Sequence, residues 1–181
     1  GKFKLSKQIS KVIVTMGGGD EFHKTLLACR ALEKFFSGKK GKGKPLVTVV
    51  VGAGFDGKLK TALNKLSLRN KSFKLVENPS NLPAWLASSD LALTSGGITM
   101  YECALLGLPQ VVLPRTRNYE GKAVRIFEKN YAVLSAYNEL QVANAIGKIS
   151  SFEMRKKMSS AGSKVVDGKG AERVAEIALS N

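Results

Sequence analysis

The residues best suited to chemistry lie in one short stretch, SGGITMYE, from Ser95 to Glu102. The residues before it, DLALT, have the pattern of a buried strand, and those after it have the pattern of a helix. Backbone N–H groups at the start of a helix bind anions such as phosphate. Thr99 and Glu102 are three residues apart, so they share one face of that helix. The stretch therefore predicts a phosphate site with a carboxylate nearby that can hold ribose hydroxyls.

The same two residues also fit a purely structural interpretation. In a capping box, a Thr side chain and a Glu three residues later satisfy each other's free backbone N–H groups at the helix start. Thr99 and Glu102 have that spacing. Spacing alone favours the capping box, so the surrounding elements must decide between the two.

Two more glycine-rich stretches follow segments with a strand pattern. Gly17-Gly18-Gly19-Asp20 allows either a close backbone approach to an anion or a tight turn with Asp20 as a helix cap. The stretch GAGFDG (52–57) matches the dinucleotide fingerprint, with Glu77 twenty residues further on. This match makes an NAD-binding oxidoreductase domain an alternative function. The short, lysine-rich helix that follows and the position on the second strand argue against it.

Other residues with reactive side chains are few. His23 is the single histidine and follows the glycine triplet, whereas Arg115 and Arg117 follow the strand-like PQVVLP. Cys29 and Cys103 lie in apolar helical patterns, and we expect both to be reduced core thiols. This inventory gives little support to a metal site or a serine triad. We therefore predict no metal and no cofactor other than a bound ligand.

Short apolar strands alternate with helical patterns along the whole chain. Continuous apolar strands separated by helices are typical of a parallel sheet that is covered on both faces. Right-handed crossovers then give a doubly wound, Rossmann-like α/β domain, which we expect to be a single domain over residues 1–181. Such sheets bind ligands beyond the carboxyl ends of their strands, where the glycine-rich stretches fall. Helical patterns over 151–181 are expected to pack on this domain.

Charge is the main anomaly of the composition. The chain has 29 Lys and Arg against 14 Asp and Glu, a net charge of +15. A field of this sign attracts nucleic acid, anionic membranes or phosphorylated ligands. The densest run, Ser37 to Pro45, contains no aromatic residue on which a base could stack. A basic nucleic-acid-binding module remains an alternative, but nucleic acid is not the favoured partner.

The hydropathy pattern indicates where in the cell the protein is expected to be found. No apolar run approaches the roughly 20 residues that cross a bilayer. The first residues lack the apolar core of a secretory signal. We expect a cytoplasmic protein, with contact to a membrane surface left open by the positive charge.

Four segments carry a resemblance to a known family: VIVTMGGGD, VTVVVGAGF, SDLALTSGGITMYECALLGLP and VDGKGAERV. Over nearly its whole length, the chain resembles the C-terminal, nucleotide-binding half of GT-B-type nucleotide-sugar enzymes. It is most similar to UDP-sugar hydrolases of the pseudaminic-acid pathway and to spore-coat polysaccharide biosynthesis proteins. The resemblance implies binding of a UDP-sugar as half of a glycosyltransferase or hydrolase in polysaccharide or nonulosonic-acid biosynthesis.

The resemblance also implies roles for residues at the carboxyl edge of the sheet. Those that would hold UDP are Gly96, Gly97, Ile98 and Thr99 for the diphosphate, Glu102 for the ribose, and Asn78 to Leu82 for the uracil. Those on the sugar and phosphate side of the cleft would be Gly18, Gly19, Arg115 and Glu120. The chain departs from the family at Tyr119-Glu120, where members usually carry an Asn-Gln pair.

The family's N-terminal half supplies the catalytic histidine of the hydrolases, and nothing in these residues matches it. The resemblance thus implies no catalytic residue in this chain and a partner, either an N-terminal half or a separate subunit. A cleft wall without its partner exposes apolar surface, so we also expect self-association.

Overall fold

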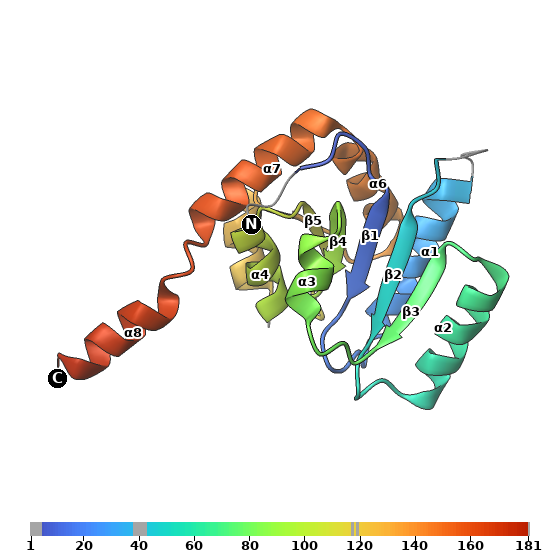
Figure 1. Cartoon of the computed structure of the whole chain (residues 1–181), viewed down its shortest axis with the longest axis horizontal. Helices are drawn as coiled ribbons and strands as arrows, with labels where there is room; N and C mark the ends of the chain where they lie inside the picture. The colour runs from blue at the N-terminus through green and yellow to red at the C-terminus, as the bar shows by residue number, and fades with distance from the viewer. Residues whose placement is uncertain (1–4, 38–42, 117, 119, 181) are drawn as a thin grey trace.

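Figure 1 shows the computed structural model of the chain, which describes residues 5–37, 43–116, 118 and 120–180. Within these ranges, six parallel strands form one sheet in the order β3-β2-β1-β4-β5-β6. The strands are β1 (Lys11–Thr15), β2 (Leu46–Val51), β3 (Phe73–Glu77), β4 (Leu91–Thr94), β5 (Gln110–Val112) and β6 (Leu134–Ser135). The predicted doubly wound parallel sheet is confirmed. Much of the lysine-rich run and Arg117 and Tyr119 lie outside the described residues.

Helices cover both faces of the sheet. They are α1 (Lys24–Ser37), α2 (Gly57–Arg69), α3 (Leu82–Ala87), α4 (Ile98–Leu106), α5 (Gly121–Lys129), α6 (Glu139–Ile149), α7 (Phe152–Val165) and α8 (Gly170–Leu179). In the ranges that the structure describes, no helix is both long and apolar enough to cross a membrane.

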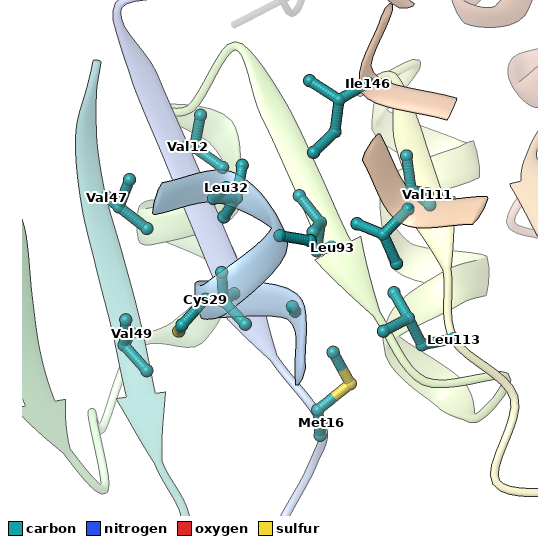
Figure 2. Close-up of a cluster of buried hydrophobic side chains, with 14 of the residues drawn as sticks. Val12, Met16, Cys29, Leu32, Val47, Val49, Leu93, Val111, Leu113 and Ile146 are labelled. Carbon is teal, nitrogen blue, oxygen red and sulfur yellow. The ribbon is translucent and has the colours of Figure 1, made fainter. Parts of the chain in front are cut away.

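Alternating strand residues feed separate hydrophobic clusters on the two faces of the sheet. Val12 and Val14 of β1 belong to the core beneath α1, α2 and α6, whereas Ile13 joins the core beneath α3 and α4. Figure 2 shows the first core, with Leu32 of α1 and Ile146 of α6 beside strand side chains. Because both faces are covered, the strands are almost continuously apolar, as the sequence predicts.

The strand order creates a crevice next to β1. From β1 the chain moves outward to β2 and β3, then returns to the other side of β1 to form β4, β5 and β6. Thr15 at the end of β1 pairs with Thr94 at the end of β4. The loops after these two strands leave the sheet in opposite directions, which opens a ligand crevice at this edge. They carry the GGG and SGG sequences.

The two C-terminal helices differ in their packing. Helix α7 packs against α4, and Gly162 of α7 lies against the backbone of Ala104. In α8 no residue is buried, and every residue from 167 to 180 is exposed. Figure 1 shows α8 projecting from the domain. The expected packing of residues 151–181 therefore extends only to α7, because α7 already covers the outer side of α4.

The buried Arg155 of α7 ties the beginning of the described chain to the domain. Its guanidinium donates to the carbonyls of Ile149 and Ser150 and to those of Ser6 and Lys7, at 2.8–3.2 Å. Such charged hydrogen bonds are stronger than neutral ones. The segment that enters β1 is thus fixed beside the start of α7.

Both cysteines lie in the core, as predicted. Cys29 and Cys103 are free thiols with no exposed surface. Burial raises the pKa of each thiol well above its ordinary value. A thiol that stays protonated is a poor nucleophile, so neither cysteine is suited to catalysis.

Two glycines in the middle of helices, Gly162 of α7 and Gly147 of α6, give a matched test of the packing of α7 on α4. A Cβ at Gly162 would lie 2.8 Å from the Ala104 carbonyl oxygen, whereas one at Gly147 would lie 3.8 Å from the Phe35 ring. We expect Gly162→Ala to lower the free energy of unfolding by about 1–3 kcal/mol because α4 and α7 must separate. Gly147→Ala should raise it by about 0.5–1 kcal/mol through helix propensity. Urea denaturation measures both, and equal effects would contradict the close α4–α7 contact.

Candidate functional site

The start of α4 is the centre of the candidate site. The helix begins at Ile98 with Gly97 as its N-cap, and no side chain caps it. Thr99 therefore lies inside the helix, and the capping-box interpretation of Thr99 and Glu102 is wrong. The first N–H groups of a helix have no partner within it. Those of Ile98 and Thr99 are thus available to an anion, and Ile98 is 80% exposed.

Glu102 supplies a free carboxylate one turn into α4. Its side chain is half-buried on the same face as Thr99. Within the part of the chain that the structure describes, no hydrogen bond or ion pair engages this carboxylate. A carboxylate held on a helix without an internal partner can accept hydrogen bonds from the hydroxyls of a ligand.

Glu120 joins the two loops that flank this helix start. Its buried carboxylate accepts the N–H of Gly96 at 3.0 Å and that of Arg115 at 2.9 Å. It also pairs with the Arg115 side chain, with Nε 2.8 Å from Oε1. The Gly96 N–H is therefore already used within the protein. A diphosphate contact through this N–H is thus excluded in this structure, and direct ligand contacts of Glu120 and Arg115 stay predictions.

Gln110 is a positioning residue that sequence reasoning missed. It is fully buried at the start of β5, and its amide Nε2 donates to the carbonyl of Met100 at 2.9 Å. The Thr94 hydroxyl donates to the Gln110 Oε1 at 3.2 Å. This pair fixes the first turn of α4 against β4 and β5. The available signal was a single amide in the otherwise apolar stretch PQVVLP.

The glycine loop after β1 forms the other side of the crevice. Gly17 has a left-handed backbone, with φ of +88°, and a Cβ at Gly18 or Gly19 would meet nothing within 4 Å. Asp20 accepts the N–H groups of Lys24 and Thr25 in the first turn of α1. The helix begins at Lys24, four residues after Asp20, so Asp20 holds the helix start without being its N-cap residue. Gly18 and Gly19 are exposed, and their contact with a sugar phosphate stays a prediction.

The GAGFDG stretch is a packing motif in this fold. A Cβ at Gly52 would lie 2.5 Å from the carbonyl oxygens of Gly17 and Gly18. In addition, the Gly54 N–H donates to the carbonyl of Gly18. These glycines therefore allow the β1 and β2 loops to approach each other. In a dinucleotide site, the equivalent space admits a pyrophosphate. The NAD alternative is consequently not favoured.

The segment after β3 reaches the same side of the sheet as α4. Asn78 adopts a left-handed backbone with φ of 40°, and the chain then crosses to α3. Leu82 at the start of α3 packs in the core that contains Cys103 of α4. The stretch predicted to face a uracil is thus brought near α4 by this crossover, and its base contact stays a prediction.

His23 also lies at this edge of the sheet. Its Nε2 is 2.7 Å from Oδ2 of Asp56, so it links the β1 and β2 loops. The Leu59 N–H and then His23 lower the pKa of Asp56 from its ordinary value. Among the described residues, no cluster of His, Cys, Asp or Glu could hold a metal ion. His23 is therefore best explained as a bridge between loops.

The crevice between the β1 and β4 loops is located by the strand order and not by a cavity. A broad open depression of about 880 Å³ lies elsewhere, along α2, and is lined by residues from Asp56 to Lys65. The site is instead located by the strand order and by the free groups of α4.

The fold is shared with parts of solved enzymes: the chain has a Rossmann-like fold similar to about half of a MurG and of a UDP-GlcNAc 2-epimerase. Acinetobacter baumannii MurG has a TM-score of 0.78 at 9% identity, with 97% of this chain and 51% of MurG covered. The Neisseria meningitidis UDP-GlcNAc 2-epimerase bound to UDP-GlcNAc has a TM-score of 0.68 at 17% identity, over 98% of this chain and 46% of that one.

In sequence, the chain is 24% identical to the spore coat polysaccharide biosynthesis protein SpsG of Bacillus subtilis, over 97% of this chain and 51% of SpsG. No protein-family model matches the chain. It spans about half or less of the length of the curated relatives that it matches. The expected resemblance is confirmed at the level of the fold.

Two glutamates near the crevice should respond differently to removal. Glu120→Ala leaves the buried N–H group of Gly96 and the part-buried one of Arg115 without their acceptor, so we expect a loss of about 1–3 kcal/mol in the free energy of unfolding. Glu102→Ala removes a carboxylate with no internal partner, and the change should stay within about 0.5 kcal/mol. Urea denaturation followed by circular dichroism compares them. A loss for Glu102→Ala as large as that for Glu120→Ala would show that Glu102 is structural.

Proposed function

We propose that the chain binds the UDP part of a nucleotide sugar at the start of α4, as the C-terminal half of a glycosyltransferase or UDP-sugar hydrolase. The observation that carries this proposal is the pairing of free backbone N–H groups with a free carboxylate on the same helix face. A diphosphate matches the first and a ribose diol matches the second. Both groups lie at the crevice where such sheets bind ligands.

The comparisons support this ligand class. One structural neighbour is MurG, and another is a UDP-GlcNAc 2-epimerase bound to UDP-GlcNAc. The relative SpsG takes part in spore coat polysaccharide biosynthesis. A place in polysaccharide or nonulosonic-acid biosynthesis is accordingly the context that we propose for this chain.

In the complete enzyme, this chain would hold the nucleotide and favour its departure. The Ile98 and Thr99 N–H groups, together with the positive end of the α4 dipole, would stabilise the negative charge that develops on UDP as the sugar bond breaks. Glu102 would fix the ribose, and the exposed β1 glycines would face the sugar. A base from the partner half would activate water or another acceptor.

The exposed face of α8 fits a partner of this kind. Val174 and Ile177 are three residues apart on one helix face and are 67% and 65% exposed. The relatives extend over about twice the length of this chain. We propose that an N-terminal half, on the same or a separate polypeptide, covers both this face and the open side of the crevice.

The proposed ligand can be tested by calorimetric titration of UDP into the wild type and Glu102→Ala. Losing a hydrogen bond to a charged group should weaken UDP binding by about 1–3 kcal/mol, or roughly 5- to 150-fold. Glu153→Ala removes an exposed carboxylate from α7 and serves as the control, with unchanged affinity. Circular dichroism verifies that each variant is folded.

The alternatives give different results in the same titrations. If NAD binds and UDP does not, the oxidoreductase interpretation replaces the proposed one. Nucleic-acid binding would weaken steeply with salt, because released counterions dominate the affinity. If UDP binds the wild type and Glu102→Ala equally, Glu102 has no part in the site.

The α8 face makes a separate prediction about association. Without a covering partner, we expect the chain to self-associate through Val174 and Ile177, because exposed apolar patches associate in water. Ile177→Glu should shift sedimentation toward the monomer, while Ala175→Glu, which adds the same charge at an exposed position off this face, should not. A wild type that sediments as a monomer at all concentrations would contradict this use of α8.

A further inference from the structure

A groove on the opposite edge of the sheet has features of a second binding site. It has a volume of about 470 Å³ and lies between the end of α5 and the face of α7. Its lining residues are Asn130, Tyr131, Lys157, Ser160, Ala161, Lys164 and Val165. The loop that lines it precedes β6, so the groove opens where the strands begin, along the edge that α7 passes in Figure 1. The start of α4 lies at the other edge.

The groove is cationic and contains no carboxylate among its lining residues. Lys157 and Lys164 are exposed and form no ion pair with a residue that the structure describes. They are seven residues apart on α7, so they share one face and lie about 10 Å apart along the helix axis. Ser160 lies between them and adds a hydroxyl. Glu153, one turn before Lys157, stands outside the groove.

Tyr131 occupies a backbone position that would be less strained with glycine. It follows the end of α5 with φ of 60°, in the left-handed region that side chains disfavour. Its ring is nevertheless exposed, and Nζ of Lys157 lies 3.4 Å from the ring centroid. This backbone lets the Tyr131 and Ala132 N–H groups close the end of α5, as in a Schellman cap, where glycine is the usual residue. The tyrosine holds the Lys157 ammonium at the groove instead of leaving it free in solvent.

The C-terminal end of α5, which lines the groove, does not repel an anion through free carbonyl groups. Helix C-termini carry partial negative charge through their free carbonyls. In α5, the Ile126 carbonyl accepts from the Asn130 side chain, and those of Phe127 and Glu128 accept from the N–H groups of the next loop. These carbonyls are therefore occupied. The groove combines a hydroxyl, an aromatic ring and two lysines that form no ion pair within the described part of the chain.

We infer that this groove binds a phosphate-bearing ligand, through Lys157 and Lys164, independently of the nucleotide site. The inference does not depend on the proposed function. Phosphate accepts hydrogen bonds from ammonium and hydroxyl groups, and two cations about 10 Å apart suit a ligand or surface with more than one phosphate. The phosphate can belong to a soluble molecule or to a lipid headgroup.

The test uses inorganic pyrophosphate and phosphatidylcholine vesicles containing phosphatidylglycerol, both with UDP in excess to occupy any nucleotide site. We expect at least one probe to bind the wild type, and the double variant Lys157→Gln, Lys164→Gln to bind it at least tenfold more weakly. The control is Lys148→Gln, Lys156→Gln, which removes the same charge outside the groove and should change affinity less than twofold.

The possible results show which kind of molecule carries the phosphate and whether the groove is where it binds. Binding of pyrophosphate identifies a soluble ligand, and binding of vesicles alone identifies a lipid surface. Equal losses in the two double variants, or no binding of either probe, overturn the inference. Glu102→Ala should leave binding to the groove unchanged. A failure of the proposed UDP site can therefore be distinguished from a failure of the groove.

Tyr131→Gly adds a readout that a structural role would not give. Relief of the left-handed strain should raise the melting temperature, while loss of the ring should weaken probe binding at least threefold. A lower melting temperature with unchanged binding would show that the tyrosine only ties α5 to α7, and would overturn its place in the site.

Discussion

The position of β1 in the centre of the parallel sheet determines where this protein can bind a ligand. Right-handed crossovers place β2 and β3 on one side of β1 and β4 to β6 on the other. The loops after β1 and β4 must therefore diverge, and the space between them cannot be filled by either. Glycine-rich sequences at these two loops keep that space free of side chains. The α4 helix, which starts at this point, directs its free N–H groups to the same edge.

Buried polar side chains hold this edge in place before any ligand arrives. Gln110 fixes the first turn of α4, Asp20 fixes the start of α1, and Glu120 joins the β4 and β5 loops. Each satisfies backbone groups that would otherwise be buried without partners, which is costly. A preorganised loop loses little conformational freedom on binding, so more of the interaction energy appears as affinity.

The sequence predicts the fold well because strand and helix patterns are local and strong. The site is only partly predictable. The pattern around Thr99 fits both a cap and a ligand wall, and the structure excludes the cap because the helix starts at Ile98, before Thr99. The partners of Glu120 depend on loops brought together by the fold, and spacing cannot reveal them. The exposure of α8 was likewise hidden, because its amphipathic pattern looks the same with or without a covering partner.

The arrangement of charges around α4 constrains how a diphosphate can sit. Glu120 lies against Gly96, so a phosphate there would face a buried carboxylate as well as an occupied N–H group. In the proposed site, a diphosphate at Ile98 and Thr99 would avoid both conflicts, and the ribose would lie within one turn of Glu102. The Arg115 side chain neutralises Glu120 at 2.8 Å, which limits its repulsion of the ligand. The two glutamates thus have different roles. Glu120 holds the β4 and β5 loops together through hydrogen bonds inside the protein, and Glu102 has a carboxylate that is available to the proposed ligand.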